Sequence, residues 1–243
     1  MTLFLRSLLF YLFIIIWTIS ITSLLSPLVF FKNTKVMSIL GIVWSRVFIN
    51  SLRIICNIKI TVKGKENIPK DPFIIASKHQ SVIETVFYLQ YLHYPVYVIK
   101  KELLKIPFYG WFLVNMGMIP VDRSGNISAL KKMLKDCEKF INEKRSVIIF
   151  PEGTRVKPFQ SKDYHPGIVA LRNKFSQIPI LPVALNAGLF WKKSSFIKYP
   201  GNIIIEFLPV INNKSNNKEF LQSLKQIIDD NSDKLCKLSK NKL

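Results

Sequence analysis

The sequence predicts an α/β fold, in which a mostly parallel or mixed sheet is flanked by helices and preceded by a hydrophobic two-helix membrane anchor. Two observations lead to this prediction. From Ser7 to Phe31 the chain carries no charged residue. Beyond residue 57, short apolar runs alternate with segments of helical periodicity, as strands and covering helices require. With 243 residues the chain suits one such domain with a short appendage better than two full domains.

The first predicted element is an apolar helix from Leu3 to Leu25. At about 1.5 Å per residue this helix would be about 35 Å long, which is enough to span a bilayer. Pro27 disfavours its continuation. A cleaved signal peptide has an apolar run of only about 7–15 residues and a small-residue cleavage site, and this segment shows neither. We therefore expect a retained anchor.

The second predicted helix, Met37 to Ile58, carries an apolar stripe that Arg46 and Arg53 interrupt. This pattern is typical of an amphipathic helix at the membrane interface or packed against the first helix. More basic residues follow the first helix than precede it, which places the following chain in the cytoplasm. We divide the chain into a membrane-anchoring helical pair, residues 1–57, and an α/β domain, residues 58–243. The alternative is that the two helices cover the domain's own core.

The α/β domain is predicted to alternate strands and helices along the chain. The strands are Ile58–Val62, Phe73–Ser77, Val96–Ile99, Met118–Val121, Val147–Phe150, Ile180–Leu185 and Ile203–Phe207. The helices are Ser81–Leu92, Tyr109–Asn115, Ile127–Asn142, Gly167–Lys174 and Lys218–Asp230. The Lys-rich run from Lys234 to Lys242 is predicted to be a solvated tail.

Composition restricts the classes of partner. The 35 Lys and Arg residues against 15 Asp and Glu residues give a formal charge of +20, which favours nucleic acid, an acidic membrane surface or phosphorylated substrates. The chain is also rich in Ile and Asn, so part of this charge is explained equally well by an AT-rich genome. The three cysteines show no metal-ligand or C-x-x-C spacing, which indicates a reduced protein without a metal or cofactor.

The first candidate site follows the strand that ends at Ser77, in the sequence KHQSVIETVF. His79 and Glu84 would point about 140° apart on a continuous helix, so we expect His79 before the helix and Glu84 in its first turn. Ser81 is then expected to cap the helix, because Ser-x-x-Glu is the capping-box pattern. The Glu84 carboxylate could reach the His79 imidazole. Spacing alone favours the simpler role, in which Glu84 only accepts the backbone N–H of Ser81.

Two more motifs follow strands of the predicted sheet, where functional groups gather in such folds. The sequence VDRSG places Arg123 after one strand. In FPEGTR, residues 150–155, Pro151 and Gly153 are predicted to form a tight turn that places Arg155 after another strand. The planar guanidinium suits bidentate binding of phosphate. Each arginine alone could form a surface salt bridge, but two at neighbouring strand ends predict a phosphate site.

With these motifs the chain resembles the 1-acyl-sn-glycerol-3-phosphate acyltransferases, also called lysophosphatidic acid acyltransferases, from about residue 58 to 208. FPEGTR is the specific block, whereas H-x-x-x-x-E alone is weak. The other matching blocks are His79 with Ser81 and Glu84, Val121 to Arg123, Leu181 to Val183, and the element of Lys100, Glu102, Leu103, Pro107 and Gly110. Glu84 stands where most members have Asp, and some bacterial members carry Glu there.

The resemblance implies transfer of an acyl chain from acyl-CoA or acyl carrier protein to the sn-2 hydroxyl of lysophosphatidic acid, which makes phosphatidic acid. His79 is implied as general base and Glu84 as the carboxylate that orients it. The implied substrate-binding residues are Lys100, Arg123, Glu152, Gly153, Thr154 and Arg155. Anionic membrane lipids are implied as further partners and nucleic acid is not, with the domain on the cytoplasmic side of a bacterial inner membrane.

Two other interpretations stay open on the sequence. The acceptor could be another lysolipid, such as a lysophospholipid or a lyso-ornithine lipid, or glycerol 3-phosphate. A non-catalytic, basic membrane-surface protein would explain the charge, but not FPEGTR. The acyl donor, its chain length, and whether the first helix spans the bilayer or lies in one leaflet are also left open.

Overall fold

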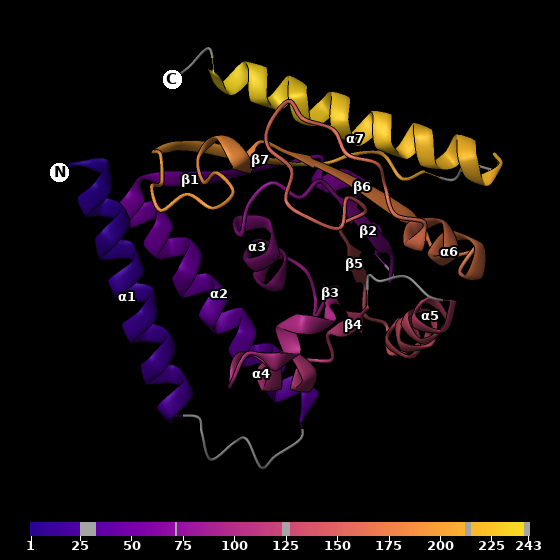
Figure 1. Ribbon diagram of the computed structural model, residues 1–243, viewed down its shortest axis with the longest axis horizontal. Coiled ribbons are helices and arrows are strands. Elements are labelled where there is room, and N and C mark those ends of the chain that lie inside the picture. Colours follow the sequence, from indigo (N-terminus) through magenta and orange to yellow (C-terminus); the bar gives the residue numbers. More distant parts are fainter. Residues whose placement is uncertain (25–32, 71, 123–126, 212–214, 241–243) are drawn as a thin grey trace.

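The computed structural model describes residues 1–24, 33–70, 72–122, 127–211 and 215–240. Within these ranges, seven strands form one sheet in the order β1-β7-β6-β2-β5-β3-β4 (Figure 1). They are β1 (Ile58–Lys63), β2 (Ile74–Ser77), β3 (Val96–Lys100), β4 (Ile119–Val121), β5 (Val147–Ile149), β6 (Ile180–Leu185) and β7 (Gly201–Phe207). The strands from β6 to β4 run parallel, and β7 is antiparallel to β6 and parallel to β1. The predicted mixed α/β sheet is confirmed.

Helices cover both faces of this sheet (Figure 1). One layer contains α1 (Leu3–Leu24), α2 (Thr34–Cys56), α3 (Ile83–Tyr91) and α4 (Tyr109–Asn115), and the other contains α5 (Ile127–Asn142), α6 (Gly167–Lys174) and α7 (Asn217–Lys240). The described residues also include the short 3-10 turns η2 (Lys65–Asn67), η3 (Lys101–Lys105) and η4 (Ala187–Leu189). Every residue of β2 and β6 is buried, as expected for strands covered on both faces.

Alternation along β2 assigns successive side chains to the two layers. Ile75 packs in the core cluster that includes α2 and α3, whereas Ile74 and Ala76 pack in the cluster that includes α5, α6 and α7. Ser77 follows the first direction, because its hydroxyl lies 2.8 Å from the Tyr88 hydroxyl of α3. The side chains of β2 therefore fix which helical layer each of the next residues faces as the strand ends.

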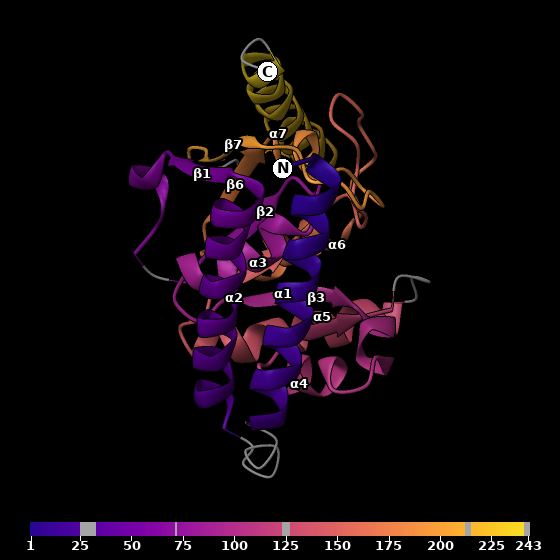
Figure 2. The ribbon, with the colours of Figure 1, turned by 90° about the vertical axis from the view of Figure 1, so that its left-hand side faces the viewer.

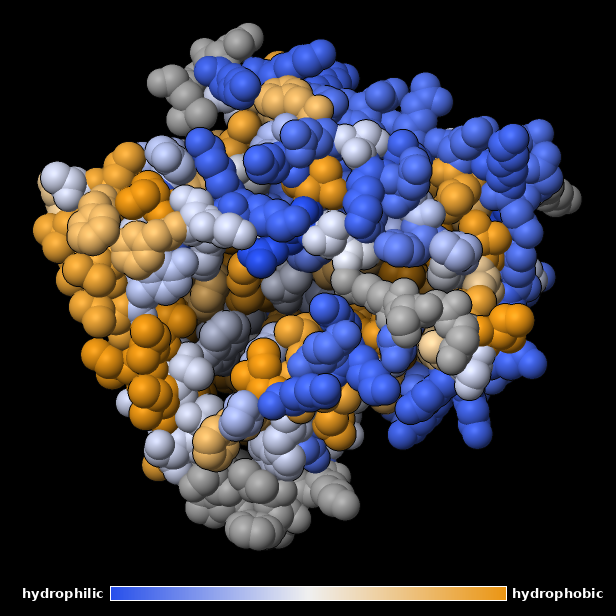
Figure 3. All heavy atoms as spheres, viewed as in Figure 1, coloured by the Kyte–Doolittle hydropathy of each residue, from blue (hydrophilic) through white to orange (hydrophobic). Residues whose placement is uncertain are grey.

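The two N-terminal helices form an antiparallel hairpin at one side of the domain (Figure 2). By length and composition both could cross a membrane, at 22 and 23 residues. α1 exposes most of its apolar side chains, while α2 buries a stripe that includes Phe48 and Leu52 in the core. Figure 3 shows the hydrophobic surface gathered over α1. The hairpin thus exposes an apolar outer surface and also covers part of the core.

The first turns of α1 are held by the segment that precedes β7. The backbone N–H of Lys198 donates to the Ser7 hydroxyl at 2.9 Å. The buried Lys198 ammonium lies 3.3 Å from the ring centroid of Tyr11 and 4.1 Å from that of Trp191. Such cation–π contacts are favourable when the cation is removed from water. This end of α1 is therefore fixed to the α/β domain.

The C-terminal run is helical where the sequence predicted a solvated tail. α7 continues to Lys240, ten residues beyond the predicted end, and residues 241–243 lie outside the described part. The positions that it buries recur every three or four residues: Phe220, Leu224, Ile228, Ser232, Leu235, Cys236 and Ser239. The tail prediction is wrong because the lysines between these positions occupy the solvent face of one amphipathic helix.

Replacement of Leu235 by alanine tests this correction. Leu235 is 2% exposed and packs in the cluster with Ala184 and Leu208, so Leu235→Ala should lower the free energy of unfolding by about 2–5 kcal/mol. Leu238 lies on the same helix at 47% exposure, and Leu238→Ala should change stability by no more than about 0.5 kcal/mol. Chemical denaturation measures both. Equal effects of the two substitutions would contradict the packing of α7.

Candidate active site

His79 and Glu84 meet at the carboxyl end of β2. Nδ1 of His79 lies 2.9 Å from Oε1 of the fully buried Glu84, and the His79 side chain keeps 16% of its surface exposed. The same Oε1 accepts the backbone N–H groups of Gln80 and Ser81, each at 2.7 Å. Because this oxygen is an acceptor, Nδ1 carries the shared proton and the lone pair lies on Nε2.

The start of α3 departs from the prediction. The helix begins at Ile83 behind Val82, which makes no side-chain cap hydrogen bond, and the buried Ser81 hydroxyl has no hydrogen-bond partner among the described residues. The predicted Ser81 cap is therefore wrong. Glu84 binds the N–H groups of both preceding loop residues, so the helix starts two residues late and one carboxylate oxygen fixes both the loop and the imidazole.

The backbone of His79 is held on both sides by the segment after β5. Its N–H donates to Oε2 of Glu152 at 2.8 Å, and its C=O accepts the N–H of Val156 at 2.8 Å. The His79 ring stacks on Phe150, with ring centroids 4.2 Å apart. Among the described residues none hydrogen-bonds to Nε2. The FPEGTR segment thus positions the imidazole, and the nitrogen with the lone pair remains available.

Both carboxylate oxygens of Glu152 contact other groups of the protein. The residue is fully buried, and Oε1 lies 2.6 Å from the Lys78 ammonium, which also lies 2.6 Å from Oδ1 of Asp229 on α7. Lys78 and the His79 amide contact its two oxygens, and its implied role as a substrate-binding residue stays a prediction. Glu152 acts within the protein, on the catalytic loop.

Burial disfavours the charged forms of this pair. For Lys78 burial lowers the pKa, but the Glu152 and Asp229 carboxylates outweigh it and raise the pKa above its ordinary value. Burial raises the pKa of Glu152 even though the Lys78 ammonium and the His79 N–H oppose the shift. The two carboxylates thus favour the charged form of Lys78, and the Lys78 ammonium opposes the rise that burial imposes on the pKa of Glu152.

The rest of FPEGTR forms the rim of the site. Gly153 has φ +64° and donates its N–H to the Phe150 carbonyl at 2.9 Å, which makes the tight turn that the sequence predicted. Thr154 and Arg155 are half-buried, and the Lys193 ammonium reaches the Thr154 hydroxyl at 3.5 Å.

A hollow of about 750 Å³ lies beside Thr154. Its lining includes Lys157, Lys192, Lys193 and Lys240, and no carboxylate. Figure 3 shows hydrophilic surface over α7 and the adjacent loops. Clefts lined by one sign of charge raise the local concentration of oppositely charged ligands. This part of the surface suits a phosphate-bearing ligand.

Lys100 and Arg123 are the other residues implied to bind the phosphate. Lys100 lies at the end of β3, opposite Val121, with its side chain 50% exposed and 3.8 Å from Glu102. The next residues of the two strands, Lys101 and Asp122, form an ion pair at 3.8 Å. Arg123 lies outside the described residues. Phosphate contacts of Lys100, Arg123 and Arg155 therefore stay predictions.

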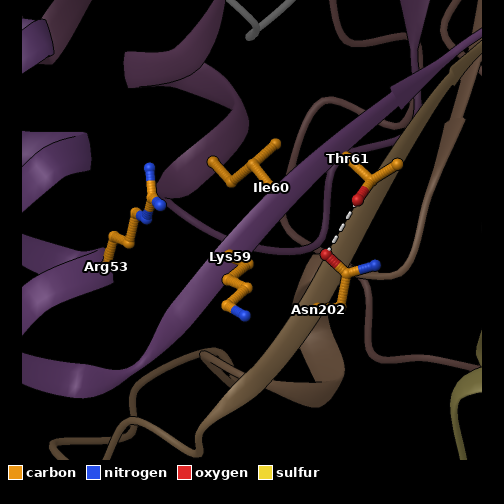
Figure 4. A pocket seen from close by; sticks show the side chains of 5 residues that line it. All are labelled: Arg53, Lys59, Ile60, Thr61 and Asn202. Atoms are coloured by element: carbon orange, nitrogen blue, oxygen red, sulfur yellow. Dashed lines mark hydrogen bonds between the residues drawn. The ribbon is translucent and has the colours of Figure 1, made fainter.

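Two other features contribute no group to this site. The block Leu181 to Val183 is the buried middle of β6, which is a core role. A hollow of about 340 Å³ at the outer edge of the sheet lies between the end of α2 and strands β1 and β7, where Thr61 donates to Asn202 at 3.0 Å (Figure 4). It contains none of the predicted site residues.

The sequence predictions missed Lys78 and Asp229. A lysine that directly follows a largely apolar strand requires a carboxylate partner if it is buried, and that requirement is a usable signal for Lys78. Asp229 has no comparable signal, because it lies 151 residues further along the chain. Only the packing of α7 brings it to the catalytic loop.

Comparisons with known proteins identify similar sequences and a similar fold. A family model described as Acyltransferase matches residues 59–186. The 1-acyl-sn-glycerol-3-phosphate acyltransferase of Pseudomonas aeruginosa is 37% identical over 183 residues, which cover 75% of this chain and 71% of that protein. The enzyme of the same name from Saccharomyces cerevisiae is 32% identical over 58% of this chain and 48% of its own length. The crystal structure of the 1-acyl-sn-glycerophosphate acyltransferase from Thermotoga maritima shares the fold, with a TM-score of 0.75 over 96% of this chain and 98% of that chain at 19% identity.

Replacement of Gly153 by alanine tests the turn that carries Arg155. A Cβ there would lie 2.6 Å from the His165 ring, and φ is +64°, so Gly153→Ala should lower the free energy of unfolding by about 1–3 kcal/mol. A Cβ at Gly167 would lie at an ordinary 3.7 Å from Ile149, so Gly167→Ala should leave stability unchanged or raise it by up to about 1 kcal/mol. Urea denaturation compares the two. A Gly153→Ala protein as stable as the Gly167→Ala protein would refute this view of the turn.

Proposed function

The chain belongs to the 1-acyl-sn-glycerol-3-phosphate acyltransferase family, and we propose that it transfers an acyl group from a thioester to the sn-2 hydroxyl of lysophosphatidic acid. The product is phosphatidic acid, for phospholipid synthesis. The contact between His79 Nδ1 and Glu84 Oε1 carries this proposal, because it leaves Nε2 able to accept a proton within the matched segment. Lysophosphatidic acid comes from the names of the relatives, and the residues support it as follows.

The reaction needs a base next to the acceptor hydroxyl. Nε2 of His79 removes the hydroxyl proton as the oxygen attacks the thioester carbonyl. Glu84 holds Nδ1–H and stabilises the imidazolium that forms. As the carbon–sulfur bond breaks, the imidazolium returns the proton to the leaving thiolate. The acyl chain passes directly to the acceptor, and the enzyme forms no covalent intermediate.

The anionic ends of the substrates require positive charge near this base. Arg155 follows the turn of FPEGTR, and we assign it to the acceptor's phosphate together with Arg123 and Lys100. Gly153 and Thr154 complete the rim. The basic hollow beside Thr154 suits the phosphate groups that both acyl-CoA and acyl carrier protein present, so either donor fits.

The helical hairpin supplies a route for lipid substrates. We propose that α1 and α2 anchor the domain to the cytoplasmic face of the membrane, where anionic lipids attract its basic surface. The exposed apolar side chains of α1 support contact with the bilayer, and the link from Lys198 to Ser7 holds that helix against the domain. Lysophosphatidic acid then reaches the site from the membrane.

The decisive test is turnover of the purified protein with lysophosphatidic acid and with each donor. Formation of phosphatidic acid is the expected result. Parallel assays with lysophospholipids, lyso-ornithine lipid and glycerol 3-phosphate separate the alternative acceptors. Turnover of one of these in place of lysophosphatidic acid would overturn the proposed substrate, and absence of turnover with all of them would overturn the proposed activity.

His79→Ala should lower kcat by about 10²–10⁴-fold, because general-base catalysis is lost. The matched control is His93→Ala, which removes an exposed histidine outside the site and should leave kcat unchanged. Initial rates of phosphatidic acid formation measure both. Wild-type turnover in the His79→Ala protein would sink the mechanism.

Glu84→Asp should retain appreciable turnover, since a shorter carboxylate can still accept from Nδ1 and from the loop N–H groups. Glu84→Ala removes all three hydrogen bonds of Oε1 and should approach the loss seen in His79→Ala. Ranking the kcat values of the three variants checks this order. The interpretation of Glu84 fails if Glu84→Ala is as active as Glu84→Asp.

A further inference from the structure

A buried chain of charges connects α7 to the backbone of His79. Asp229 Oδ1 and Glu152 Oε1 each lie 2.6 Å from the Lys78 ammonium, and Glu152 Oε2 accepts the His79 N–H at 2.8 Å. Lys78 and Glu152 are 1% and 0% exposed, and the Asp229 side chain is 16% exposed. The chain thus runs from the partly solvated face of α7 to the catalytic loop.

We propose that Lys78 and Asp229 are positioning residues for the acyl-transfer reaction, and that α7 sets the orientation of His79 through them. The inference rests on the role of His79 in the proposed function. It extends the catalytic apparatus to a helix that begins 31 residues after the end of the segment matched by the family model.

The strand geometry explains why Lys78 can act on its neighbour. Lys78 extends the hydrogen bonding of β2, since its N–H donates to the Val183 carbonyl at 2.9 Å. Its side chain reaches α7, on the opposite side of the sheet from α3, where the next side chain, His79, meets Glu84. Successive side chains of extended backbone point to opposite faces, so fixing Lys78 on one face fixes the direction of His79 on the other.

Asp229 also ties the segment after FPEGTR to the same point. The Ser161 hydroxyl donates to Asp229 Oδ2 at 2.6 Å, and the Lys78 ammonium reaches the Gln160 carbonyl at 3.4 Å. The helix therefore holds both segments that meet at His79, the one after β2 and the one after β5.

The energetics favour positioning over simple stabilisation. Removing charges from water offsets most of the attraction between them, so a buried ion pair is a weak source of stability. In some proteins such a pair enforces one arrangement instead, because any shift leaves a buried charge unpaired. A misplacement of about 1 Å at a reacting group can reduce the rate by about 10²-fold, so such an arrangement matters most next to a catalytic base.

The test compares Asp229→Asn with Asp230→Asn, which removes the neighbouring exposed carboxylate of the same helix. We expect Asp229→Asn to lower kcat by about tenfold or more, with the KM values for acceptor and donor within about twofold of wild type. Asp229→Glu, which restores the charge, should recover part of kcat. Asp230→Asn should behave like wild type. A purely structural role predicts lower thermal stability with unchanged kcat per folded enzyme, and that result would overturn the proposal.

Hydrogen exchange gives a readout that does not depend on turnover. In the full-length protein, Asp229→Asn should speed deuterium uptake in peptides that cover residues 77–81, where the His79 N–H bonds to Glu152, and leave peptides of α2 and β7 unchanged. Uptake that rises throughout the protein, or does not change at residues 77–81, would overturn the proposal. Hydrogen exchange needs no substrate, so it tests the positioning role even if lysophosphatidic acid is not the acceptor. A failure of the proposed function can therefore be told apart from a failure of this proposal.

Discussion

The two backbone hydrogen bonds of His79 are the constraint on which the site depends. The backbone N–H donates to Glu152, and the backbone C=O accepts the N–H of Val156. One short segment therefore holds both backbone polar groups of His79. An imidazole must be placed within a fraction of an ångström to act as a base. A loop residue has little intrinsic order, and here the order comes from a second motif about 70 residues away.

Positively and negatively charged side chains lie in different places around the site. The net charge is strongly positive, yet the groups that fix His79 are the buried carboxylates Glu84 and Glu152. The lysines that line the hollow beside Thr154 lie outside this buried set, and of the residues that the structure describes only Lys78 contacts it. Positive charge therefore lies at the surface of the protein, where it suits the phosphate groups of the proposed substrates. Negative charge lies behind the imidazole, where it would stabilise the protonated form that the proposed proton transfer requires.

The N-terminal hairpin and the catalytic domain share one core. Residues of α2 pack in the same cluster as the strands next to the site, and the Lys198 contacts with Tyr11 and Ser7 fasten α1. A membrane anchor joined only by a flexible linker would leave the distance from lipid to base undefined. In this protein the apolar outer surface of α1 is fixed relative to the segments that form the site, which suits an enzyme whose acceptor lies in the bilayer.

The sequence by itself determined the elements of the sheet and the motifs at the ends of its strands, because apolar periodicity and short spacings such as His79 to Glu84 are local properties. It also predicted the turn at Gly153, since a tight turn needs a residue that tolerates positive φ. The tertiary structure alone decided which carboxylate holds which partner. It showed that Glu152 pairs with Lys78 and binds the His79 N–H, and that the Ser81 hydroxyl does not cap α3. It also showed that the lysine-rich C-terminal segment continues the helix that carries Asp229. Those outcomes depend on contacts between segments distant in the chain, where burial makes each buried charge require a partner that no local pattern specifies.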